Sequence, residues 1–221
     1  MRRAATSHRR GAIMHEKADR AALLSALTAE HFVLQTAYTS TVTEAAARST
    51  LYVMALSSTL VAMGFLSQSR DLFQPFAATI LPVVFLLGLV TVVRLVDTGL
   101  ESMQYLTGIA RIRGFYRTLS KEAAQHFTPE QGRWPERESP ANRLGALSAF
   151  LGTTASMIAV INSVVAGATV NLFVQMFSPT APKSLGIALS VVLALTLTVA
   201  FLIYQRWRFS LFDAVPGQKR T

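Results

Sequence analysis

The sequence predicts an all-α, polytopic membrane protein with four transmembrane helices, a cytoplasmic N-terminal helix and a cytoplasmic helical middle loop. Of the 221 residues, 51% are hydrophobic and 15% are charged, whereas an average soluble domain carries about 25% charged residues. The charges are also bunched, so that long uncharged tracts separate them. This composition excludes a disordered chain and argues against an ordinary soluble enzyme. The absence of Cys excludes a disulfide-stapled secreted domain and a thiolate metal site.

The chain before the first uncharged tract divides into two expected parts. Residues 1–15 are basic and lack the apolar stretch of a cleavable signal peptide, so we expect a disordered arm. Met14 directly precedes a plausible helix start, and we therefore expect either that Met14 is the natural start or that residues 1–13 are dispensable. Residues 16–48 contain neither Pro nor Gly and predict a cytoplasmic helix that continues into the first span.

This helix is expected to have two different faces. One is semi-apolar, because its residues recur at spacings near three and four: Leu24, Leu27, His31, Leu34, Tyr38 and Ala45. The other is rich in hydroxyls and amides: Gln35, Thr36, Thr39, Ser40 and Thr43. We favour packing on the protein's own middle loop over an interface for helix association or the lining of a vestibule. Glu44 and Arg48 are four residues apart and are expected to pair.

Four uncharged tracts are long enough to cross a bilayer, which takes about 20 mostly apolar residues. They run from Ser49 to Ser69, Leu72 to Val93, Leu147 to Val170 and Ser184 to Gln205. Buried core helices of a soluble protein are excluded, because four of them would need far more amphipathic chain around them. We therefore expect two transmembrane hairpins, 49–97 and 147–205. Pro82 predicts a kink or a late start in the second helix.

The basic residues predict the orientation of these spans. All of the 21 Lys and Arg residues except Arg70 and Lys183 lie before the first span, between the second and third, or after the fourth. Because cytoplasmic loops collect Lys and Arg, both termini and the middle loop are expected in the cytoplasm. Most of the net charge of +9 is then explained by the orientation of the chain in the membrane. No nucleic-acid partner is expected.

The middle loop, 98–146, is expected to hold an amphipathic helix and a linker. The helix, from about Leu95 to Phe127, places Arg113, Arg117 and Lys121 four residues apart on one face. Such a face could bind the phosphates of anionic lipid head groups or of a nucleotide. The alternative is that these residues only set the orientation of the chain in the membrane. The Pro-rich stretch 128–142 predicts a linker, and 206–221 a basic tail.

The third span departs from the apolar pattern. It carries two small-xxx-small steps and a central amide: Gly152, Ser156, Asn162, Ser163 and Gly167. Small residues let helices approach closely, and an amide at membrane depth needs a hydrogen-bond partner or water. We favour helix packing within the subunit, and the alternative is a polar pore lining built by several copies.

No residues predict catalysis. The spans hold no central Asp, Glu, Lys, Arg or His, and the sequence lacks a His-Glu-x-x-His motif and a Cys nucleophile. At the inner end of the second span, Arg94 is expected to snorkel and to pair with Asp97, with Glu101 one turn further. We therefore predict no catalytic residues, no cofactor and no metal.

Several segments carry a resemblance to a family. They are residues 30–37 (EHFVLQTA) leading into 51–65, then 93–96 (VRLV) and 109–117 (IARIRGFYR). In these segments the chain resembles an uncharacterised family of bacterial, mainly actinobacterial, small four-span membrane proteins. The resemblance covers most of residues 16–205 and implies the inner membrane of a bacterium. The layout also looks loosely like the small membrane effectors of bacterial defence systems.

Two functions remain open on the sequence. The first is a non-enzymatic membrane protein that self-associates through the third span and the N-terminal helix, as a pore or a membrane-perturbing assembly. The second is a monomeric or accessory scaffold whose basic middle loop docks a partner protein or anionic lipid.

Overall fold

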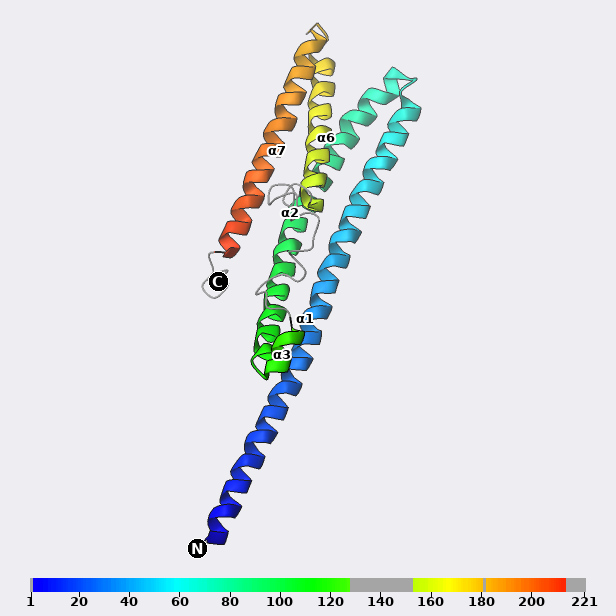
Figure 1. The fold of residues 1–221 in the computed structure, drawn as a ribbon. Helices are drawn as coiled ribbons and strands as arrows, with labels where there is room; N and C mark the ends of the chain where they lie inside the picture. The colour runs from blue at the N-terminus through cyan, green and yellow to red at the C-terminus, as the bar shows by residue number, and fades with distance from the viewer. Residues whose placement is uncertain (1, 128–152, 181, 214–221) are drawn as a thin grey trace. The chain divides into compact units, whose positions relative to one another are not determined.

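The computed structural model describes residues 2–127, 153–180 and 182–213, with side chains from residue 14 to residue 211. Its helices are α1 (Arg2–Leu66), α2 (Arg70–Arg117), α3 (Lys121–His126), α6 (Thr154–Phe177) and α7 (Lys183–Asp213) (Figure 1). The described residues contain no strand, which confirms the all-α prediction. Each of α1, α2, α6 and α7 contains a stretch long and apolar enough to cross a membrane, as predicted.

Helix α1 runs without a break from the expected cytoplasmic helix into the first apolar tract, as the sequence predicts. Its start differs from the prediction, because α1 begins at Arg2 and so includes the arm that we expected to be disordered. That arm is rich in Ala and Arg, which favour helix, and contains no Pro. Gly11 is the one poor helix former in it besides the polar Thr, Ser and His, and a single Gly is tolerated inside a helix that already extends from Glu16.

Helix α2 begins at Arg70, so Pro82 lies well inside it and the expected late start is wrong. A Pro inside a helix favours the alternative of a kink. The same helix continues past the span to Arg117. The expected middle-loop helix is therefore a direct extension of α2 that ends ten residues before Phe127.

Local hydrogen bonds explain why α2 stops at Arg117. The N–H of Thr118 donates to the Phe115 carbonyl at 3.0 Å, a tightened final turn. The Ser120 side chain then accepts from the N–H of Ala123 at 3.0 Å and starts α3 as its N-cap. This break separates Lys121, the first residue of α3, from the basic residues of α2.

The second pair of helices also differs from prediction at its ends. Helix α6 begins after Thr153, whose side chain accepts from the N–H of Ser156 at 3.2 Å. It ends at Phe177 rather than Val170, because the uncharged tract continues and the stop signal is the turn at 178–180. Helix α7 runs to Asp213, so the first part of the expected basic tail is helical. The expected linker, 128–142, and residues 147–152 of the third span lie outside the described residues.

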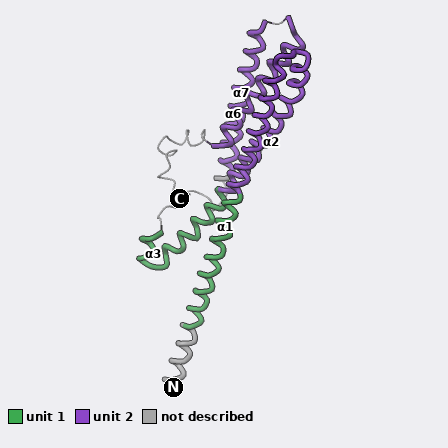
Figure 2. Tube along the Cα trace, turned by 90° about the vertical axis from the view of Figure 1, so that its right-hand side faces the viewer, with its two compact units in different colours: residues 1–40, 103–134 green, residues 41–102, 135–221 purple. Residues whose placement is uncertain are grey.

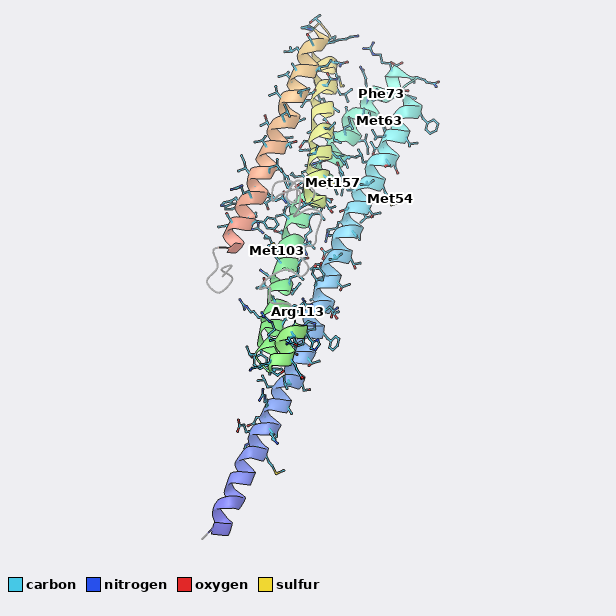
Figure 3. The ribbon with its side chains drawn as sticks, in the orientation of Figure 1. Met54, Met63, Phe73, Met103, Arg113 and Met157 are labelled. Atoms are coloured by element: carbon cyan, nitrogen blue, oxygen red, sulfur yellow. The ribbon has the colours of Figure 1, made fainter. Side chains whose placement is uncertain are left out.

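The chain forms two compact units, which Figure 2 colours separately. Unit 1 comprises 1–40 and 103–134, and unit 2 comprises 41–102 and 135–221. Unit 2 holds most of the buried apolar core, including Tyr52, Val84, Leu95, Val96, Ile158 and Val165. Its outward surface is also apolar, as at Met54 and Met157, both labelled in Figure 3 and both exposed. An apolar exterior around a core with polar members is the arrangement a lipid environment requires.

Candidate functional site

The centre of unit 2 holds an amide that joins three helices. Asn162 of α6 is 4% exposed. Its Oδ1 accepts from the hydroxyl of Tyr52 on α1 at 3.2 Å, and its Nδ2 donates to the Phe85 carbonyl on α2 at 3.1 Å. The side chain fits because α2 has a glycine at this point: a Cβ on Gly88 would lie 2.1 Å from Oδ1. The polar groups of Asn162 are therefore used inside the chain.

A second polar cluster links α6 to α7. Gln205 is 1% exposed; its Oε1 accepts from the Ser156 hydroxyl at 3.0 Å, and its Nε2 donates to Oγ1 of Thr153 at 3.2 Å. Sequence reasoning missed Gln205, because it is the last uncharged residue of its tract and marked only the end of a span. No sequence signal paired it with Ser156, because the expected spans place Ser156 nine residues from the inner end of the third span and Gln205 at the inner end of the fourth.

The small residues of α6 serve close packing. A Cβ on Gly167 would lie 2.7 Å from the backbone oxygen of Ser190, so α6 and α7 touch through their main chains. The hydroxyl of Ser163 is buried and donates to the carbonyl of Ala159 at 2.8 Å, within its own helix. Gly152 lies outside the described residues. These contacts support packing within the subunit over a pore lining made by α6.

Ion pairs gather at the end of unit 2 next to the expected cytoplasmic side. Glu44 of α1 accepts from Arg48 at 2.9 Å, as predicted, and from Arg94 of α2 at 3.1 Å. The hydrogen bond from Arg48, followed by that from Arg94, lowers the pKa of Glu44. Arg94 also lies 3.7 Å from Glu101.

Asp97 does not form the ion pair that the sequence predicts for it. Arg208 of α7 donates to its carboxylate, and Arg94 pairs with Glu44 and Glu101 instead. Sequence spacing favours partners on the same helix, whereas here a neighbouring helix brings the opposite charge closer. These ion pairs therefore connect α1, α2 and α7 at one end of unit 2.

In unit 1, the semi-apolar face of α1 packs as predicted. Most residues between its members are exposed, whereas its members in unit 1 are partly buried: Leu24, Leu27, His31, Leu34 and Tyr38. The side chain of Leu34 fits against Gly108, where an added Cβ would lie 2.9 Å away, and the Thr28 and Tyr116 hydroxyls are 3.3 Å apart. Packing on the chain's own middle segment is confirmed.

The basic residues singled out by the sequence do not share one helix face. Arg113 (Figure 3) and Arg117 lie on the last turns of α2, whereas Lys121 opens α3 beyond the break. The expected common face is wrong, because four-residue spacing gives one face only while the helix continues. Arg117 is partly buried, and among the described residues its Nε is shielded from solvent without a hydrogen-bond partner. A role for these residues in binding phosphate stays a prediction.

Within the described ranges no three His, Asp or Glu side chains gather where they could hold a metal ion. Four buried polar side chains of unit 2 bond across helices and so fix helix positions: Thr41, Ser156, Asn162 and Gln205. The other buried hydroxyls bond to carbonyls of their own helix: Thr59, Thr91, Thr98, Ser163 and Thr169. Comparisons of the chain with protein-family models, curated proteins and solved structures found no match.

Proposed function

We propose that the chain is a non-enzymatic, multi-pass protein of the bacterial inner membrane, with both termini and unit 1 in the cytoplasm. Four apolar helices and the apolar exterior of unit 2 support insertion. The distribution of Lys and Arg supports the orientation. The resident partner is then the lipid bilayer itself.

We further propose that the protein self-associates, and one observation carries this proposal. From Ala21 to Ala47 the only charged residues are Glu30 and Glu44. Phe32 and Val33 lie in this segment, outside the apolar span, and are 62% and 61% exposed. A helix face that meets water normally carries charges. We therefore assign this face to contact with further copies.

This assignment differs from the one that sequence reasoning favours. The third span was expected to share the contact, but Asn162 and Gly167 are occupied within their own chain. A pore lined by α6 would have to break the bond between Asn162 and Tyr52. In the proposed assembly, α1 makes the contact, and a pore or other membrane-perturbing activity belongs to the assembled state.

The test measures mass and flux on the same full-length preparation. Native mass in mild detergent is expected to show more than one copy, and Phe32→Glu is expected to give monomers, because it places like charges at the contact. Glu30→Gln, at an exposed position off this face, is the control. A wild-type protein that is strictly monomeric refutes self-association. Oligomers that produce no flux from dye-loaded liposomes retain self-association and refute the pore.

A second candidate function rests on Arg117. Arg117 is partly buried on the last turn of α2, its Nε has no hydrogen-bond partner among the described residues, and a guanidinium binds acidic groups strongly. The alternative role is therefore a scaffold whose basic segment docks anionic lipid or an acidic partner. Arg113→Gln with Arg117→Gln should weaken flotation with anionic liposomes more than Lys121→Gln alone, because Lys121 lies beyond the helix break. The charge-matched control is Lys17→Gln with Arg20→Gln, and equal flotation of all variants dismisses the lipid role.

A further inference from the structure

We infer that two copies meet in parallel and in register along an uncharged seam of α1. This inference rests on the proposed self-association and names the surface that carries it. Within unit 1 the seam comprises residues spaced alternately three and four apart: Ala22, Ser25, Ala29, Phe32, Thr36 and Thr39. Every one of them is exposed.

The seam lies opposite the packed face of the same helix. The packed residues, such as Leu27 and Leu34, follow their own alternation of three and four and are less exposed. A repeat of about 3.5 residues keeps one face toward a partner along the whole length of a helix pair. Helix α1 therefore has one such face used by its own chain and a second one available to another chain.

The same repeat continues along α1 in unit 2, again at exposed positions throughout. These are Thr43, Ala46, Thr50, Val53, Ser57, Leu60 and Gly64. At Gly64 an added Cβ would meet nothing within 4 Å.

The seam is less polar than its residue types suggest. The hydroxyl of Thr36 donates to the Phe32 carbonyl at 2.9 Å, and that of Thr39 donates to the Gln35 carbonyl at 3.0 Å. Hydroxyls bonded to their own helix can be covered by a partner without losing a hydrogen bond to water. The residues are also mostly small, which lets helix backbones approach closely.

The absence of charge identifies the occupant as a second copy. All copies inserted in one membrane have the same orientation and depth, so their α1 helices are parallel and in register. Each seam residue then lies near its own counterpart, and any charge would face an identical charge. Glu30, Glu44 and Arg48 all lie off the seam. A different partner protein would impose no such rule, because opposite charges could pair across the contact.

Cysteine cross-linking tests the seam directly, because the natural chain has no Cys. Single variants Ser25→Cys, Phe32→Cys, Thr36→Cys and Thr39→Cys of the full chain are oxidised in native membranes with copper phenanthroline. Disulfides need Cβ atoms within about 3.5–4.5 Å of each other. All four variants should give a dimer several-fold more abundant than the control Glu30→Cys, which is exposed but off the seam.

The outcomes separate the seam from self-association. Native mass showing oligomers, together with no cross-link at the seam or a stronger one at Glu30, overturns the seam and leaves self-association standing. A monomeric protein by native mass overturns both. A disulfide to a different protein, in place of the dimer, also overturns the seam. Thr36→Cys replaces one small exposed side chain with another, so native mass of this variant shows whether it still assembles.

Discussion

Replacing Gly88 by Ala should destabilise the membrane unit, because the new methyl group has no space. Its Cβ would lie 2.1 Å from Oδ1 and 2.4 Å from Cγ of Asn162, and 2.7 Å from Cε2 of Tyr52. Asn162 is held from two sides by its bonds to Tyr52 and to the carbonyl of Phe85. It can move only by breaking one of these bonds or by pushing α6 away from α2.

The expected cost follows from these contacts. Overpacking of a filled core costs about 1–3 kcal/mol, and an interhelical hydrogen bond in a membrane protein contributes about 0.6 and at most roughly 1.7 kcal/mol. Ala favours helix over Gly by about 0.5–1 kcal/mol, which offsets part of the loss. The free energy of unfolding should therefore fall by about 1–4 kcal/mol.

Reversible unfolding in mixed micelles with increasing SDS measures this free energy. The matched control is Gly99→Ala on the same helix, where the new Cβ would meet only Cζ of Phe209 at 3.9 Å. It should leave stability unchanged or slightly raised. Asn162→Ala should relieve Gly88→Ala, so the double variant loses less than the sum of the two single variants. If Gly88→Ala is as stable as Gly99→Ala, the close approach of α2 and α6 at Asn162 is refuted.

Two further variants test other contacts of the same unit. Gly167→Ala should lower stability by about 1–3 kcal/mol, because its Cβ would lie 2.7 Å from the backbone oxygen of Ser190; unchanged SDS unfolding would contradict the α6–α7 contact. Arg48 and Arg94 hold the folded-state pKa of Glu44 below its ordinary 4.5, so the stability from this carboxylate is present above that value and lost as pH falls through the folded pKa. Glu44→Gln should therefore flatten the acid limb of stability against pH in detergent, and identical limbs would show that the ion pairs do not contribute.

The fold class could be predicted because its signals are local. Apolar tracts of sufficient length are visible in the sequence itself, and all four have a helix in the structure. The helix ends were predicted less well, because turn hydrogen bonds and caps set them. The capping residue Ser120 and the turn at Thr118 divide a stretch that hydropathy and spacing present as one helix.

The polar sites show a similar division between what spacing can and cannot predict. Spacing predicted that Glu44 would meet Arg48, because both lie on one helix. It failed for the pair of Arg94 and Asp97, because Glu44 of α1 and Arg208 of α7 bring opposite charges to them from other helices. The two partners of Asn162, Tyr52 and Phe85, lie 110 and 77 residues away in sequence. A residue type can signal that a partner is needed, but only the packing of the helices determines which one it is.

Basic residues can have two roles, orienting the chain in the membrane and docking an acidic partner. The sequence alone does not distinguish these roles, whereas the ion pairs do. The positive-inside rule depends on Lys and Arg near the spans and takes little account of Asp and Glu. Arg94 should therefore help to orient the chain even though Glu44 and Glu101 accompany it after folding. Docking, in contrast, depends on the folded chain, where paired residues present little net field. Replacing Glu44 and Glu101 with Gln should thus strengthen binding to anionic liposomes without changing orientation, whereas replacing Arg94 acts on both. This difference makes the acidic partners the better positions at which to test recognition separately from topology.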